Sequence, residues 1–136
     1  TTADFSGVWI LDTLKSDNFY KDFDVKCTIT QTPKLITIIK TFSDKSGAEL
    51  ASHHNEYNLD GKEASRQGEN GIEKDLASWS ADKKILNTKS TVTNGPDEYG
   101  STSIYSMSDN GKVLTIQTAD INPLAPKLKL VFNKKQ

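Results

Sequence analysis

Short stretches in which apolar and polar residues alternate run along the whole chain, separated by turn residues. Val25, Cys27 and Ile29 alternate with polar neighbours, the pattern of a strand with one buried face. Residues 35–42 form the most β-prone segment, because β-branched side chains dominate it. The pattern predicts strands at residues 8–11, 25–30, 35–42, 48–59, 62–67, 72–80, 84–93, 98–108, 112–118 and 128–132.

Turn residues join these segments in sequence. Asp60-Gly61 predicts a two-residue hairpin, because a type I′ turn needs positive φ angles that glycine adopts cheaply. Helix is expected only as a turn or two between Ser16 and Phe23, with Ser16 or Asp17 as the cap. Strands joined by short turns favour an antiparallel meander, and closure of the meander removes its exposed edges. We therefore expect one all-β domain over residues 1–136, an up-and-down barrel of eight to ten strands.

Composition narrows the class of protein. Of 136 residues, 35% are hydrophobic and 26% are charged, which is lean but sufficient for one core. Lysine and arginine together number 17 against 18 acidic residues, so the basic surplus of a nucleic-acid binder is missing. The apolar runs are very short, as at residues 130–132, whereas a membrane helix needs about twenty apolar residues. We expect no nucleic-acid partner and no membrane-spanning helix.

Gly7 and Trp9 stand at the start of the first predicted strand. This Gly-x-Trp arrangement resembles the first-strand signature of lipocalins, fatty-acid-binding proteins and other calycins, whose Trp closes one end of an antiparallel barrel. Residues 15–17 (KSD) and 110–116 (NGKVLTI) are similar to segments of small exported bacterial lipocalin-like proteins. The resemblance implies a lipocalin-like barrel. Because the chain also begins with Thr1-Thr2-Ala3, we expect a secreted or periplasmic protein whose signal peptide has been removed.

The last strand departs from the families that the chain resembles. Lipocalins place an arginine from that strand across the tryptophan, but Arg66 is the only arginine of this chain and lies mid-chain. Lys134 or Lys135 is expected to lie over Trp9 instead. Fatty-acid-binding proteins hold a carboxylate with an inward Arg and Tyr, whereas the matching face here is apolar. The carboxylate device of that family is therefore not expected.

Candidate chemistry is sparse. His53, His54 and Glu56 form the one histidine cluster, and alternation along a strand puts His54 and Glu56 on one face and His53 on the other. Two ligands are fewer than zinc requires, so no metal site is predicted. Cys27 lies on an apolar face and is expected to be buried and inert. Neither a nucleophile elbow nor a C-terminal haem ligand is present, so we expect no cofactor and no enzyme. Catalysis involving His54 or Glu56 stays a third alternative.

The predicted inward faces combine aromatic, aliphatic and hydroxyl side chains, as in a small-molecule pocket. The candidate ligand-binding residues are Trp79, Tyr99, Ser101, Ser103, Tyr105, Met107, Leu128, Leu130 and Phe132. The same residues would also line a filled barrel. The polar face at residues 87–93 favours a wet cavity over a dry core.

These patterns predict a monomer that binds and sequesters a small, largely hydrophobic ligand inside a barrel. The alternative is a filled barrel that acts through its surface, as a protease-inhibitor-type or other interaction protein. Its contact region would be the segment from Ile121 to Ala125 or the pair Phe19-Tyr20.

Overall fold

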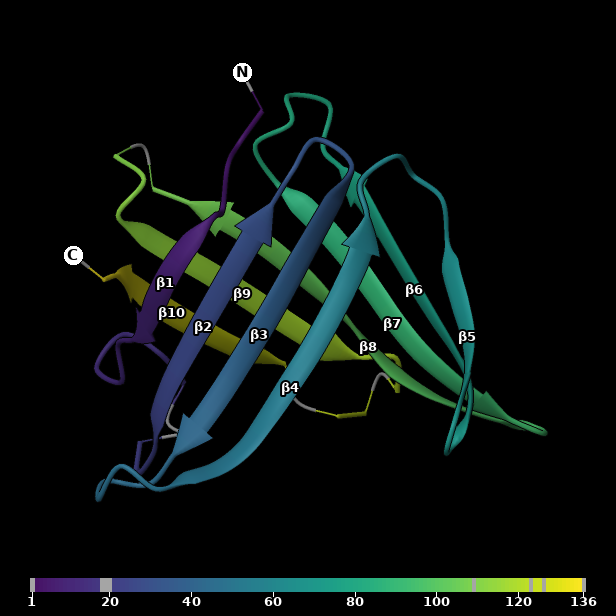
Figure 1. Cartoon of the computed structure of the whole chain (residues 1–136), viewed down its shortest axis with the longest axis horizontal. Helices are drawn as coiled ribbons and strands as arrows, with labels where there is room; N and C mark the ends of the chain where they lie inside the picture. Colours follow the sequence, from purple (N-terminus) through teal and green to yellow (C-terminus); the bar gives the residue numbers. More distant parts are fainter. Residues whose placement is uncertain (1, 18–20, 109, 123, 126, 136) are drawn as a thin grey trace.

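Ten antiparallel strands form one sheet in the computed structural model of the chain (Figure 1). The structure describes residues 2–17, 21–108, 110–122, 124–125 and 127–135. The strands are β1 (Gly7–Leu11), β2 (Asp24–Gln31), β3 (Leu35–Ser43), β4 (Glu49–Asn58), β5 (Ala64–Gly68), β6 (Gly71–Trp79), β7 (Leu86–Asn94), β8 (Asp97–Met107), β9 (Val113–Asp120) and β10 (Leu128–Lys134). No helix in the described residues has the length and hydrophobicity needed to cross a membrane.

The sheet curls into a nearly closed up-and-down barrel. Its strand order is β4-β3-β2-β1-β10-β9-β8-β7-β6-β5, so the first and last strands pair and join the two halves of the meander. Figure 1 shows β1–β4 in front of β7–β10, with the strands of the two layers crossing. The two edges of the sheet, β4 and β5, border an open seam. The predicted fold class is confirmed.

The hairpin predicted at Asp60-Gly61 is wrong, although the chain does turn there. Gly61 has a φ of +84°, and the Asp60 carboxylate accepts a hydrogen bond of 3.0 Å from the Lys62 backbone amide. The strand after the turn begins only at Ala64 and pairs with β6 instead of β4. Ion pairs between Arg66 of β5 and carboxylates of β6 stabilise this pairing. A favourable turn therefore formed without a strand pair.

The helical turn predicted between Ser16 and Phe23 is absent from the described residues of that segment, which form turns and bends; residues 18–20 lie outside the description. Ser16 does not cap a helix, because its hydroxyl oxygen accepts a hydrogen bond of 2.8 Å from the Val131 amide. The Asp17 carboxylate accepts one of 2.7 Å from the Lys129 amide. These residues therefore satisfy the backbone of β10 beyond the point where β1 ends.

The N-terminal segment closes one end of the barrel. Phe5 and Trp9 are fully buried, and the Trp9 indole N–H donates a hydrogen bond of 2.9 Å to the Phe5 carbonyl. The Phe5 ring stacks on Trp79 with 6.0 Å between centroids and meets Tyr105 edge-on at 6.3 Å. We call these four aromatic residues the plug. Aromatic pairs of this geometry contribute beyond the area they bury.

Lys134 is the lysine that covers Trp9, with its ammonium 5.5 Å from the ring centroid. The structure thereby decides between Lys134 and Lys135. The lysine stem crosses Gly7, where an added Cβ would lie 3.0 Å from Lys134 Cε and where φ is +139°. Glycine is needed at this position both for its backbone conformation and for the close approach of the lysine.

Candidate functional site

Beyond the plug, the interior of the barrel becomes polar. Inward positions follow from the pairing register, since side chains that share a face with buried partners such as Ile38 and Cys27 point into the barrel. Charged, amide and hydroxyl side chains occupy the following inward positions: Lys40, His53, Asn55, Arg66, Glu73, Asp75, Thr88, Ser90, Ser101, Ser103 and Thr118. A core packed only for stability would leave few such groups inside.

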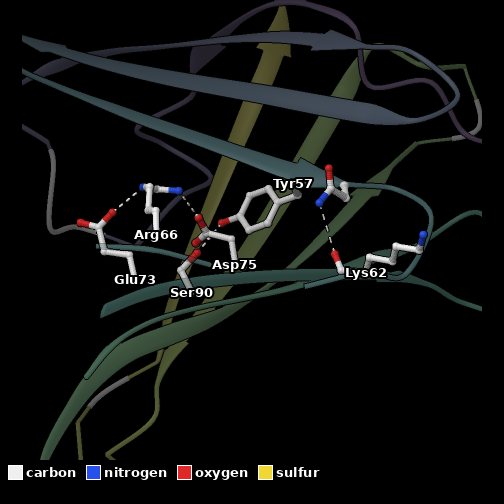
Figure 2. Close-up of polar contacts among 7 residues, drawn as sticks. Tyr57, Lys62, Arg66, Glu73, Asp75 and Ser90 are labelled. Carbon is white, nitrogen blue, oxygen red and sulfur yellow. Dashed lines mark hydrogen bonds and ion pairs between the residues drawn. The ribbon is translucent and has the colours of Figure 1, made fainter. Parts of the chain in front are cut away.

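A polar network lies at the seam between β4 and β5 (Figure 2). The Arg66 guanidinium contacts Asp75 at 2.9 Å and Glu73 at 2.6 Å. The Tyr57 hydroxyl of β4 reaches across to β7 and shares a hydrogen bond of 2.7 Å with Ser90, the pairing partner of Asp75. β4 and β5 share no backbone ladder, and the Tyr57–Ser90 hydrogen bond joins β4 to β7 across the barrel through side chains.

Two tyrosines next to this network stay protonated over a wide pH range. Burial raises the pKa of Tyr57, and the negative charge of Asp75 acts in the same direction. Burial also raises the pKa of Tyr105 well above its ordinary value, against hydrogen bonds with Thr88 and Ser103. Both phenols therefore remain neutral hydrogen-bonding groups at physiological pH.

Lys40 of β3 points inward between Cys27 and His53, its pairing partners on β2 and β4. Burial lowers the pKa of the Lys40 ammonium, and Cys27 opposes this shift. Cys27 is buried, and burial raises the pKa of its thiol to about 11. The prediction of a buried cysteine is confirmed, and its protonated thiol fits an inert role.

A pocket of about 330 Å³ is lined by Phe23, Phe42, Leu50, Ala51 and His53. The Phe42 and His53 rings meet edge-on with 5.4 Å between centroids. Two lining residues are neighbours of Lys40 on the inner face: Phe42 is two residues along β3, and His53 is the pairing partner of Lys40 on β4. A second pocket, of about 460 Å³, is lined by Trp79 of the plug together with Gln31 and other residues.

The nine candidate ligand-binding residues share the inner face, but their surroundings differ. Tyr105, Leu130 and Phe132 are buried in the core, and Trp79 belongs to the plug. Of the other five, Ser103 is buried and shares a hydrogen bond of 3.0 Å with Thr118. Three are half-buried, namely Ser101, Met107 and Leu128. Tyr99, near the N-terminal end of β8, is 61% exposed. The structure thus separates them into residues that fill the barrel and residues that reach its open part.

The charged residues of the interior were not predicted from the sequence. Lys40 follows Ile36 and Ile38 at the same alternating spacing, and that register was a usable signal. Arg66, as the only arginine, gave no indication of its partners Glu73 and Asp75, because the pairing of β5 with β6 decides them.

The other candidate sites lie outside the barrel or outside the description. His54 and Glu56 are exposed, and within the described residues no three His, Cys, Asp or Glu side chains gather as metal ligands. Leu124 is 91% exposed in the loop before β10, whereas residues 19, 20 and 123 are not described.

Comparison with known proteins supports the fold. No protein-family model and no curated protein sequence matches the chain. A crystal structure of a secretary abundant heat soluble (SAHS) protein from Ramazzottius varieornatus, from a dimer sample, matches over 98% of both chains, with 13% sequence identity and a TM-score of 0.62. At this identity the likeness shows the fold alone. The lipocalin-like barrel implied by Gly7 and Trp9 is thus the architecture of this chain.

Proposed function

We propose that this protein binds a small amphipathic molecule in the part of the barrel interior that the plug leaves open. The main support for this proposal is that several inward side chains keep contact with solvent. His53 is exposed, and Lys40, Asn55, Ser90 and Ser101 are half-buried, although all five share a face with core residues. A filled barrel would bury these positions, so their exposure supports an accessible interior.

The lining of this region defines the kind of ligand. Phe42 and Leu128 supply apolar surface, while Tyr57, Ser90 and Ser101 supply hydroxyl groups. Burial of apolar ligand area contributes about 25 cal/mol per Å², and the hydroxyl groups fix orientation. The proposed ligand is therefore largely hydrophobic, as the sequence led us to expect, and also carries a polar part. Sequestration is the proposed role, because apolar area and hydroxyl groups hold and orient a ligand.

A fluorescent probe tests this proposal. N-phenyl-1-naphthylamine, a neutral dye that brightens in apolar surroundings, is titrated into the wild type, Ser101→Phe and Thr102→Phe. Ser101 points inward and Thr102 is an exposed outward neighbour on β8, so the pair differs in face and not in position along the strand. We expect saturable binding in the wild type and Thr102→Phe, and at least tenfold weaker binding in Ser101→Phe. Equal binding by all three, or none by the wild type, would contradict the proposal.

A further inference from the structure

Lys40 is a charged group without a counter-ion in the described interior. Its ammonium makes no hydrogen bond or ion pair with a described residue, and Cys27 is the one group that acts on it electrostatically. A half-buried ammonium in a protein gains from a carboxylate partner, because partial loss of hydration without one costs free energy.

The carboxylates that could have served are engaged elsewhere. Asp75 and Glu73 contact Arg66 of β5, and Asp24 contacts Lys45 at 2.9 Å on the surface. Cys27 stays a neutral thiol up to a pH of about 11 and so supplies no negative charge. Among the described inward side chains, Lys40 therefore offers an incoming anion an amine that no carboxylate occupies.

The pocket lined by two inward neighbours of Lys40, Phe42 and His53, is largely apolar. Phe42 is the next inward residue of β3, roughly 7 Å along the strand, and with Phe23, Leu50, Ala51 and His53 it lines the pocket of about 330 Å³. This volume is at the small end of the range for ligand pockets, which fits a compact molecule better than a long chain.

We propose that Lys40 binds the anionic group of a small organic acid whose apolar or aromatic body occupies the pocket beside Phe42 and His53. The inference rests on the proposed function, because it assigns the ligand class and one anchor of the same interior. A charged hydrogen bond between the ammonium and a carboxylate, sulfonate or phosphate oxygen fixes the orientation. The apolar pocket then distinguishes an organic acid from a free inorganic anion.

Two dyes with one aromatic skeleton test the anchor. 8-Anilinonaphthalene-1-sulfonate carries a sulfonate that N-phenyl-1-naphthylamine lacks. The affinity for the sulfonate dye divided by the affinity for the neutral dye therefore reports the contribution of the charge. We expect Lys40→Met to lower this ratio at least tenfold, since a charge-assisted hydrogen bond has about that effect on affinity. Lys40→Arg retains the ratio. Lys89→Met, which removes an exposed lysine from the outer face of β7, leaves it unchanged.

The outcomes separate the two proposals. If both dyes bind and Lys40→Met leaves their ratio unchanged, the anchor is wrong and the proposed function stands. If neither dye binds the wild type, both proposals fail. Displacement of the sulfonate dye by an equal concentration of inorganic phosphate would show a plain anion site and would overturn the assignment to an organic acid.

A second measurement on the wild type guards against misfolding of Lys40→Met. Reductive methylation with ¹³C-labelled formaldehyde gives each accessible lysine its own NMR signal. The Lys40 signal is expected to shift on addition of the sulfonate dye and not on addition of the neutral dye. Equal shifts with both dyes would contradict the proposal.

Discussion

Gly7, Trp9 and Lys134 connect the first strand of the barrel to the last. The indole of Trp9 is buried with its N–H satisfied by the Phe5 carbonyl, and the lysine stem lies across Gly7 to reach the ring. The lysine can reach the indole only if position 7 is glycine, because a Cβ there would displace the lysine stem. The Gly-x-Trp arrangement therefore specifies a contact at the barrel closure.

Loss of the Lys134 ammonium tests that contact. Lys134→Met is expected to lower the free energy of unfolding by about 0.5–1 kcal/mol, because a cation–π contact is lost while the apolar stem is retained. The measurement is urea unfolding, and Lys135→Met is the matched control, since that lysine lies beside Lys134 without covering Trp9. Equal effects of the two substitutions would show that Lys134 makes no special contact.

Cys27 gives a residue-scale prediction about pH. Its pKa of about 11 in the folded protein lies above the value of about 8.5 for a free thiol, so the thiolate is scarce at pH 8. We expect Ellman's reagent to leave the native protein unmodified at pH 8 and to modify one thiol per chain in guanidinium. Because the folded pKa is raised, stability from the neutral thiol is retained below about pH 8.5 and decreases as the pH rises toward about 11. Rapid modification of the native protein at pH 8 would be evidence against burial.

At the scale of elements, the strand pattern could be predicted closely and the seam could not. Alternation at Val25, Cys27 and Ile29 places β2, because the two-residue period of a strand is written directly in the sequence. The turn at Asp60-Gly61 is equally local. Whether the strands on either side of it pair depends instead on Arg66, whose carboxylate partners are decided by tertiary structure. Local rules therefore gave the turn and missed the open seam.

The ion pairs of β5 are expected to hold that strand to β6. Arg66→Met leaves Asp75, whose side chain is 4% exposed, without its cationic partner. Because the guanidinium itself is 52% exposed, we expect a discounted loss of about 1–3 kcal/mol in the free energy of unfolding. Lys45→Met breaks the exposed pair with Asp24 and should cost less than about 1 kcal/mol. Similar losses in both variants would argue against a special role for the buried carboxylate.

The Tyr57–Ser90 hydrogen bond is expected to restrain β4 at the seam. Tyr57→Phe removes the hydroxyl and should lower the free energy of unfolding by about 1 kcal/mol, with faster amide hydrogen exchange in β4 than in β2. Ser90→Ala should have a similar effect, and the double variant should lose little more than either single variant. Additive losses would show that the two hydroxyl groups act independently.

In the whole molecule, we propose that a plug at one end and a seam at the side leave part of the interior open. Alternation along the strands predicted which residues face inward, as Ser101, Ser103 and Tyr105 show. It did not predict which inward residues are buried and which keep contact with solvent. Which inward residues are buried depends on where Phe5 and Trp9 lie, and chain alternation carries no information on that point. The charged part of the interior, with Lys40 on β3 and Arg66 on β5, emerges only when the strands are placed in one sheet.

We propose that the open part of the interior is a binding chamber, and an NMR titration of ¹⁵N-labelled protein with N-phenyl-1-naphthylamine tests this proposal. We expect saturable shifts of the amides at His53, Phe42 and Ser101, with little change in the exposed loop at Leu124. Saturable shifts confined to that loop, or no saturable shift at any amide, would contradict it.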